Sequence, residues 1–360
     1  MPGNVDLSVV IVSHNVGPLL GSCLESVLRE CAGMQTEVFV VDSASTDGTV
    51  QLVQNRFPAV RLRVSPENIG FPAGNNLAIP ECRGRYILLL NPDTLVQEGA
   101  LRSLMRYLDQ HPSVGAVGPT LRLANGEIQP ECARNLPTPA SLLPWLLLLD
   151  KLEWQLRFRR RHRPTAVHPP RGTLLDRFNL LSWKRDQTCE VEYICGAGMM
   201  MRREVIQQIG LLDETSPLYL DDLDYCRRIR EAGWQIHFVA GPTITHFWQQ
   251  SSSGFKREGD FYAMICHAMW LYFRKHHGRA AAMRFSAIAA AATVLRLPTC
   301  LLALMLPGRS WRTFWRRQLH MVLGLGRWAF QVPKRAPRFG FACEAQAVAG
   351  VPHRFLDRTS

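Results

Sequence analysis

Residues 7–15, LSVVIVSHN, are an apolar run that ends in three polar side chains. Valine and isoleucine dominate the run, which is typical of a strand buried on both faces. The run is too short for the core of a signal peptide, and no basic segment precedes it. Residues 18–30 follow with apolar side chains at helical spacing. The opening of the chain therefore predicts a buried strand, a polar tip and a helix.

The same strand-then-helix pattern continues along the chain. Further strands are predicted at residues 37–42, 60–65, 86–90 and 115–121, and helices at 45–57 and 100–112. After a looser insert at about 130–190 come a strand and helix at 190–210, a helix that ends at Gly233 and a strand at 235–241. Such alternation predicts an α/β fold with a mostly parallel, Rossmann-like sheet flanked by helices. We expect this domain to cover residues 1–265.

The chain has 42 Lys and Arg against 30 Asp and Glu, a formal net charge of +12. Residues 261–343 contain no acidic residue, while thirteen Lys or Arg lie between Arg274 and Arg338. This excess predicts an anionic partner. Because the basic residues lie among apolar, tryptophan-rich segments and no nucleic-acid module is recognised, a membrane surface is favoured and nucleic acid is not expected. The ten cysteines form no C-x-x-C pair, which favours a reducing cytoplasm over a disulfide framework or zinc site.

A helical region is predicted at residues 266–335, followed by a tail at 336–360. Residues 285–308 are apolar, but Arg296 and Pro298 interrupt them, so that neither half reaches the ~20 residues that span a bilayer. Residues 309–328 place aromatic side chains on one side of a helical wheel and arginines largely on the other. We predict an interfacial or re-entrant hairpin, with a true span and a partner helix as alternatives.

The insert contains a second segment of this kind at residues 144–164. An apolar run there is followed by five arginines within seven residues. A helix packed on the body with a solvated basic end explains this composition as well as a membrane-facing flap does.

Polar side chains lie where three predicted strands stop. Ser13 and Asn15 follow the first strand, Asp42 follows the second, and Asn91 with Asp93 follows residues 86–90. A single Asp after a strand is usually a turn or a helix cap. Tips of neighbouring parallel strands, however, meet in one crevice, so together these residues predict a ligand site at that edge of the sheet.

The loop at residues 66–76, PENIGFPAGNN, is rich in glycine and asparagine. These residues let the backbone approach a ligand closely and supply amide donors. The G-x-x-x-x-G-K pattern of a P-loop is absent, and GAGMMM at 196–201 lacks the third glycine of a dinucleotide fingerprint. The loop is therefore expected to bind a ligand in a different manner from either motif.

Six motifs in order resemble the inverting family 2 glycosyltransferases with the GT-A fold, and within them the rhamnosyltransferase-like branch. They are VSHN (12–15), VDSASTDGT (41–49), NIGFPAGNN (68–76), LLNPDT (89–94), GAGMMMRREVIQQIGLLDE (196–214) and YLDDLDYCRRIREAGW (219–234). Each motif alone is weakly specific, but the ordered set, over about residues 6–250, is highly specific.

The resemblance implies roles for the strand tips. Asp42 would accept a hydrogen bond from the nucleotide base. Asp93 matches the last carboxylate of the family's D-x-D motif, which holds Mg²⁺ or Mn²⁺ against the donor diphosphate. His246 lies where many relatives place a further metal ligand, although a histidine between apolar residues is more often part of the core. The other residues expected to bind the donor are Ser13, Asn15, Asn68, Gly70, Asn75 and Asn91.

The resemblance also explains three acidic residues within four positions. Asp222 matches the general base that removes the proton of the acceptor hydroxyl, and crowding by Asp221 and Asp224 would raise the pKa of one member of the group. Such residues also favour a helix N-terminus for structural reasons alone. The residues expected on the acceptor side are Gly198, Asp221 and Asp224.

Two departures from the family pattern matter. Asn91 replaces the first D-x-D carboxylate, so the metal is expected to bind weakly without donor phosphates. Pro72 and Pro80 are expected to change the shape of the donor loop and the helix after it.

The sequence therefore predicts a metal-dependent, inverting glycosyltransferase of cell-surface polysaccharide synthesis, peripheral at the cytoplasmic face of the cell membrane. The expected donor is dTDP-rhamnose or a UDP-sugar, and the acceptor is a glycan or a polyprenyl-diphosphate-linked sugar. The alternative is a peripheral membrane protein or partner subunit that binds a nucleotide-sugar without catalysis.

Overall fold

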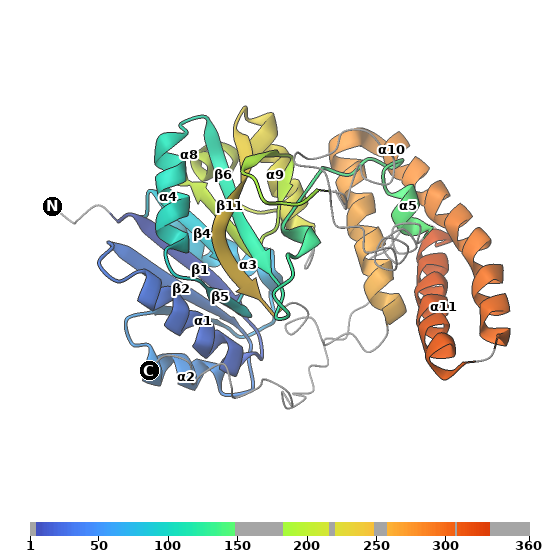
Figure 1. Cartoon of the computed structure of the whole chain (residues 1–360), viewed down its shortest axis with the longest axis horizontal. Coiled ribbons are helices and arrows are strands. Elements are labelled where there is room, and N and C mark those ends of the chain that lie inside the picture. The colour runs from blue at the N-terminus through green and yellow to red at the C-terminus, as the bar shows by residue number, and fades with distance from the viewer. Residues whose placement is uncertain (1–4, 148–182, 216–219, 248–257, 307, 332–360) are drawn as a thin grey trace.

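The computed structural model describes residues 5–147, 183–215, 220–247, 258–306 and 308–331. Figure 1 shows an α/β body, coloured blue to yellow, beside a group of long helices coloured orange to red. The predicted α/β class and the helical C-terminal region are confirmed. Most of the predicted basic flap (148–164) and the tail at 336–360 lie outside the described residues.

The body is built on a nine-stranded sheet. In spatial order its strands are β3 (Arg61–Ser65), β2 (Thr36–Ser43), β1 (Leu7–Ser13), β4 (Tyr86–Leu90), β10 (Gly198–Arg202), β6 (Val114–Arg122), β11 (Gln235–His246) and β5 (Thr94–Val96), with β8 (Cys189–Val191) on β11. The first four strands run parallel, as do β6 and β11. β10 runs antiparallel to both β4 and β6. The sheet is thus more mixed than predicted, because β10 follows other short strands directly, and an antiparallel strand needs no crossover helix.

Helices and short segments complete the body. These are α1 (Gly17–Glu30), α2 (Thr49–Arg56), α3 (Gly70–Ala78), η1 (Ile79–Glu81), α4 (Ala100–Gln110), η2 (Pro130–Cys132), α8 (Arg203–Ile209), α9 (Asp221–Glu231) and the two-stranded sheet of β7 (Ala133–Arg134) and β9 (Tyr193–Ile194). The short helix α5 (Leu143–Leu146) lies beside the C-terminal helices instead (Figure 1). Every residue of β1 is buried, as expected for a strand covered on both faces.

Backbone register sets where the strand tips lie. Ser13 at the end of β1 pairs with Asp42 in β2, and Ile11 pairs with Leu90 at the end of β4. α3 crosses the same edge closely, since a Cβ on Gly74 would lie 2.7 Å from Val12 Cγ1. The carboxyl ends of three parallel strands and the start of a helix therefore meet at one place.

Two helices form the C-terminal region: α10 (Glu258–Met305) and α11 (Arg309–Ala329). The backbone of α10 leaves helical geometry at Gly278 (φ 79°, ψ 175°), so the chain turns there and α10 has a first half at 259–277 and a second half at 279–305. α11 packs against both halves. A Cβ on Gly324 would overlap the carbonyl of Gly259, and one on Gly326 would lie 2.9 Å from Thr293 Cγ2.

Arg296 and Pro298 interrupt the apolar run of the sequence but not the helix, because the second half of α10 runs through both residues. Arg296 is buried on the inner side, where Nη1 donates to the Leu146 carbonyl at 2.7 Å and the guanidinium lies 5.9 Å from the centre of the Tyr262 ring. Pro298 lies inside the helix and removes one of its N–H groups, and the helix continues to Met305.

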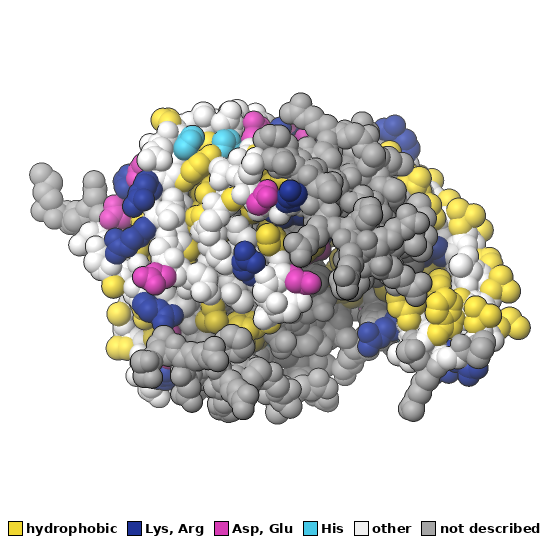
Figure 2. Space-filling view, viewed as in Figure 1, with side chains coloured by type: hydrophobic (Ala, Val, Ile, Leu, Met, Phe, Trp, Pro, Cys, Tyr) yellow, Lys and Arg dark blue, Asp and Glu magenta, His cyan; other side chains and the backbone are white. Residues whose placement is uncertain are grey.

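The outer face of the second half of α10 is apolar and exposed. Met283, Leu302 and Met305 are 65%, 66% and 79% exposed, and Figure 2 shows hydrophobic side chains gathered over this region at the right of the view. Residues 259–305 are long and apolar enough to cross a membrane, with a mean hydropathy of 1.9 in their most apolar window, of which 33% is buried. Length and composition alone do not distinguish a span from a core helix.

Candidate active site

The tips of β1 and β2 form one end of the candidate site. Asp42 is fully buried; its Oδ1 accepts the N–H of Ser45 at 2.9 Å, while Oδ2 has no hydrogen-bond partner among the described residues. The hydroxyl of Ser13, which is also buried, has none there either. Buried polar atoms are normally paired. Two of them side by side at a strand edge are therefore suited to a polar ligand.

Asn15 connects these two tips. Its backbone is left-handed (φ 52°), a conformation that asparagine tolerates better than most residues. Its N–H donates to Ser45 Oγ at 2.9 Å, and its Oδ1 accepts the N–H of Thr46 at 2.7 Å. Asn15 thus holds the loops after β1 and β2 together.

The glycine- and asparagine-rich loop lies beside β2. Asn68 Oδ1 accepts hydrogen bonds from Ser43 Oγ and the N–H of Gly70, both at 3.1 Å, and Gly70 begins α3 with φ 76°. Asn75 is fully buried; its Nδ2 donates to the Phe71 carbonyl at 2.9 Å, and its Oδ1 has no partner among the described residues. Asn68 therefore shapes the loop, and Asn75 adds another free acceptor.

A buried carboxylate and a histidine face each other next to β4. His246 Nε2 lies 3.3 Å from Asp93 Oδ1, and Asp93 is 1% exposed. Neither oxygen of Asp93 accepts a hydrogen bond from the described residues. Gln129 Oε1 accepts from His246 Nδ1 at 2.8 Å, which leaves Nε2 as the ring atom with a free lone pair. The amide nitrogen of Asn91 is 3.3 Å from the same Nε2.

This arrangement fits a divalent cation with two protein ligands. A buried carboxylate with two free oxygens and an imidazole with a fixed tautomer are both ligands that Mn²⁺ accepts. In the described part of the chain, no group of three or more His, Cys, Asp or Glu residues is arranged to hold a metal. Any ion at Asp93 and His246 would therefore need further ligands, such as donor phosphate oxygens.

Asp222, at the start of α9, accepts three hydrogen bonds. Its Oδ2 accepts the hydroxyl of Tyr193 at 2.6 Å and the N–H of Gly196 at 3.1 Å, and its Oδ1 accepts the N–H of Leu223 at 2.9 Å. Burial raises the pKa of Asp222, and these three hydrogen bonds, which favour the carboxylate, oppose that rise. The side chain is thus an oriented, half-buried carboxylate with increased basicity.

The loop before β10 joins Asp222 to the tip of β4. The N–H of Asn91 donates to the Ala197 carbonyl at 3.2 Å, and Ala197 follows Gly196, which contacts Asp222. A Cβ on Gly196 would lie 3.5 Å from Asp222 Cβ and 3.6 Å from Phe71 in α3. The structure thus brings the predicted base, the Asp93–His246 pair and the donor loop to one edge of the sheet.

Gly198 occupies a different environment. It lies within β10 opposite Leu90, and a Cβ there would point at Ile244, 3.2 Å away, in the sheet core. Gly196 rather than Gly198 is the glycine that lies against Asp222.

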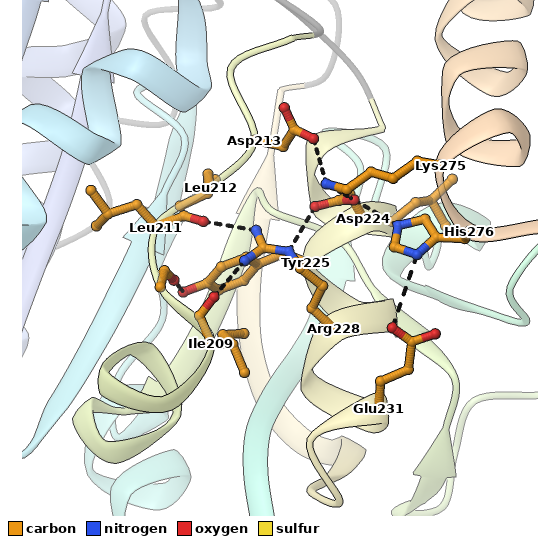
Figure 3. A network of polar contacts seen from close by, with 12 residues as sticks. Ile209, Leu211, Leu212, Asp213, Asp224, Tyr225, Arg228, Glu231, Lys275 and His276 are labelled. Atoms are coloured by element: carbon orange, nitrogen blue, oxygen red, sulfur yellow. Dashed lines mark hydrogen bonds and ion pairs between the residues drawn. The ribbon is translucent and has the colours of Figure 1, made fainter.

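Asp221 and Asp224, both predicted on the acceptor side, also differ from each other. Burial and the adjacent charge of Asp222 raise the pKa of Asp221 well above its ordinary value. Asp224 instead joins a cationic network that Figure 3 shows in close view: His276 Nε2 and Lys275 Nζ lie 2.7 Å from its Oδ1, and Arg228 Nε lies 2.9 Å from its Oδ2. Both carboxylate oxygens of Asp224 are engaged.

Figure 3 also shows how this network holds α9 to its surroundings. Arg228 donates to the carbonyls of Ile209 and Leu211, both at 2.8 Å, while Lys275 also pairs with Asp213. Although burial opposes it, hydrogen bonds from His276 and Lys275 lower the pKa of Asp224, and the charge of Arg228 adds to this. The first half of α10 is therefore tied by charge to the helix that carries Asp222.

Several residues of the site were not predicted from the sequence. Tyr193, Gly196 and Gln129 contact the predicted residues but lie 26 or more positions away from them. His276 lies on a different helical unit, 52 positions from Asp224. No local pattern identifies these partners, because only the folded chain brings them together.

Comparison with known proteins identifies the class. The sequence profile of the Glycosyltransferase like family 2 matches residues 2–260. The protein is thus a glycosyltransferase. More narrowly, the chain belongs to the Glycosyltransferase like family 2, as its motifs predicted.

Two relatives and one solved structure are informative. An N-acetylglucosaminyl-diphospho-decaprenol L-rhamnosyltransferase of Mycobacterium tuberculosis is 26% identical over 257 residues, 67% of this chain and 75% of that protein. The succinoglycan biosynthesis protein ExoO of Rhizobium meliloti is 30% identical over 169 residues, 46% of this chain and 47% of that protein. The crystal structure of GalNAc-T7 with UDP, GalNAc and Mn²⁺ has a TM-score of 0.51 at 15% identity, covering 78% of this chain and 52% of that one, and supports the GT-A fold.

The Asp224 network leads to a prediction about stability. Asp224→Asn should lower the free energy of unfolding near neutral pH by about 1–3 kcal/mol, because Arg228 and Lys275 lose their shared anion and His276 loses a carboxylate partner. The folded-state pKa of Asp224 is lowered, so its contribution is complete above about pH 4 and is lost as the pH falls below that value. Urea unfolding should show the difference between wild type and variant shrinking on acidification.

Asp186→Asn, at an exposed position, is the matched control and should produce no such pH-dependent difference. A difference for Asp224→Asn that stays constant down to about pH 3 would contradict the assignment.

Proposed function

We propose that the protein is an inverting glycosyltransferase that transfers a sugar from a nucleotide diphosphate to a glycan or polyprenyl-diphosphate-linked acceptor. The observation that carries the proposal is the position of Asp222. Tyr193 and Gly196 orient its carboxylate, and the loop at 195–197 connects it to Asn91 beside the Asp93–His246 pair. A single displacement needs a base on the acceptor side and neutralising charge on the leaving-group side, which a cation held by the Asp93–His246 pair would supply.

The proposed chemistry is a single displacement with inversion. Asp222 accepts the proton of an acceptor hydroxyl while that oxygen forms a bond to the anomeric carbon of the donor sugar. The bond from that carbon to the nucleoside diphosphate breaks, and the diphosphate leaves with the electron pair. Burial favours this role because it raises the pKa of Asp222 and makes the carboxylate more basic.

The nucleotide would lie across the tips of β1 and β2. Three buried polar atoms there have no hydrogen-bond partner among the described residues: the acceptors Asp42 Oδ2 and Asn75 Oδ1, and the hydroxyl oxygen Ser13 Oγ. Asp93 and His246 would hold Mg²⁺ or Mn²⁺, with Asn91 adjacent. Such an ion supplies neutralising charge to the departing diphosphate.

The donor we propose is dTDP-rhamnose, because the mycobacterial relative is an L-rhamnosyltransferase. Its acceptor is a GlcNAc-diphospho-lipid, which supports a polyprenyl-diphosphate acceptor here as well. A UDP-hexose or UDP-N-acetylhexosamine is the alternative donor. The product would belong to cell-surface polysaccharide synthesis, a role supported by the relative that is named for succinoglycan biosynthesis.

We place the protein at the cytoplasmic surface of the membrane, held by the outer face of α10 and by α11. Between Arg284 and Arg309, the one charged residue, Arg296, is buried, so the exposed face of this stretch carries no charge. Arg312, Arg316 and Arg317 on α11 are exposed beside the partly exposed Trp311 and Phe314. Aromatic residues among arginines at the end of an apolar face suit a layer of anionic headgroups.

The function is tested by separating transfer from donor binding. Asp222→Asn should reduce transfer by at least about 10²-fold, because the variant side chain is a poor base. It should leave the thermal stabilisation by dTDP-rhamnose or a UDP-sugar with Mn²⁺ unchanged. Asp93→Asn should abolish the Mn²⁺-dependent part of that stabilisation. Retention of most turnover by Asp222→Asn would show that the base is elsewhere.

A pH profile tests the role of Tyr193. Its hydroxyl stabilises the ionised form of Asp222, so Tyr193→Phe should raise the pKa of Asp222. Since the base must be ionised, the acidic limb of kcat/KM should move to higher pH. Tyr107→Phe, which removes a hydroxyl bonded to His237 instead, is the matched control and should leave the limb in place. A shift to lower pH for Tyr193→Phe would refute the assignment.

Membrane attachment is tested with vesicles. Replacing both Leu302 and Met305 with Asp should weaken binding to phosphatidylglycerol vesicles at least about tenfold, because two exposed apolar anchors are lost. Leu211→Asp on the body, at a side chain that is 41% exposed, should bind as wild type does. The apolar face would instead be assigned to a partner helix if the double variant bound vesicles as wild type does and if wild type were a dimer in solution that the double variant converts to a monomer.

A further inference from the structure

A pocket of about 320 Å³ lies between the start of α9 and the first half of α10. Leu220 and Asp221 line it on the α9 side, and Leu271, Tyr272 and Arg274 line it on the α10 side. Asp221 is the chain neighbour of Asp222. The pocket therefore begins one residue from the proposed base.

The walls of the pocket combine two kinds of chemistry. Leu220, Leu271 and the ring of Tyr272 present carbon atoms. Asp213 and Asp224 also line the pocket and are both paired with Lys275, and Arg274 adds a further positive charge. Arg274 is exposed, has no acidic partner among the described residues, and lies 5.3 Å from the centre of the Trp270 ring. The pocket suits a molecule with an apolar part and an anionic part.

Two buried groups inside the pocket support an anionic ligand. Tyr272 is 4% exposed, and its hydroxyl has no hydrogen-bond partner in the described part of the chain, so a donor is available. Burial and the charge of Asp222 raise the pKa of Asp221, which favours a neutral carboxyl that does not repel an anion. The negative charge of Asp224 is offset by Arg228, Lys275 and His276.

We propose that this pocket binds the diphosphate and the first isoprene units of a prenyl-diphosphate-linked acceptor, with Arg274 and Tyr272 on the diphosphate and Leu271 against the prenyl chain. The proposal rests on the function proposed above and adds to it the recognition of the acceptor's lipid end. A sugar attached to a diphosphate held here would lie next to Asp222. The prenyl chain would leave along α10, whose second half carries the exposed apolar face.

Binding of farnesyl diphosphate to the full-length protein, measured by titration calorimetry, tests the pocket without any sugar transfer. Arg274→Gln should raise its Kd at least tenfold because a charge-assisted contact is lost. Leu271→Trp should raise it similarly by filling the pocket. Arg279→Gln, which removes another exposed arginine of α10 beyond Gly278, should change it less than twofold. Inorganic diphosphate and farnesol should each bind at least tenfold more weakly than farnesyl diphosphate.

The same variants are then assayed with a prenyl-diphosphate-linked sugar acceptor. KM for that acceptor should rise at least tenfold in Arg274→Gln, with KM for the nucleotide-sugar unchanged. An unaltered Kd for farnesyl diphosphate in both pocket variants, or equally tight binding of inorganic diphosphate, would overturn the proposal. Nucleotide-sugar binding is read separately. Its absence alongside intact farnesyl diphosphate binding would refute the proposed function and leave the pocket assignment standing.

Discussion

The site depends on the hydrogen-bond register of three parallel strands. Pairing of Ser13 with Asp42, and of Ile11 with Leu90, fixes the ends of β1, β2 and β4 at one edge. The strands are fully buried, so a slip by one residue would turn every side chain to the opposite face. Such a slip would disrupt the packing of the hydrophobic core. The core packing therefore fixes the register, and the register fixes the positions of the polar strand tips. Burial of valine, isoleucine and leucine thus positions groups that are themselves costly to bury.

Three carboxylates near the start of α9 would repel one another if all were charged and equivalent, and the structure gives each a different environment. Asp224 is fully ion-paired, and its charge is offset by residues of α9 and α10. Asp222 accepts three hydrogen bonds and is half-buried, while burial of Asp221 favours the neutral form. The pKa values of the three groups are therefore driven apart. One cluster of like residues contains a structural anion, a candidate base and a neutral carboxyl.

The sequence predicted the features that depend on local pattern. Apolar runs located the main strands of the sheet, and the motifs placed Asp42 and Asp93 after strands and Asp222 at the start of a helix. It could not predict Tyr193 as the partner of Asp222 or Gln129 as the partner of His246, because those contacts arise from packing of distant segments. Antiparallel insertion of β10 was missed for the same reason.

The C-terminal helices show a different limit of sequence reasoning. Arg296 was expected to interrupt an apolar run. The sequence alone does not show whether this side chain points into the protein or toward the outer face of the helix. In the structure it points inward to the Leu146 carbonyl, so the charge lies on the packed face and the outer face stays apolar. The break in α10 lies instead at Gly278, where φ of 79° suits a residue without a Cβ.

The position of that break explains how one helix serves two environments. Before Gly278, Lys275 and His276 pair with Asp224, two residues from Asp222 in the same helix. After Gly278, the chain turns and presents Met283, Leu302 and Met305 on an exposed apolar face. If α10 were straight, its apolar half would continue in the same direction as the half that makes the charged contacts. Because the backbone turns at one residue, the charged half remains on the body while the apolar half faces outward, and the pocket between α9 and α10 lies on the charged side of the turn.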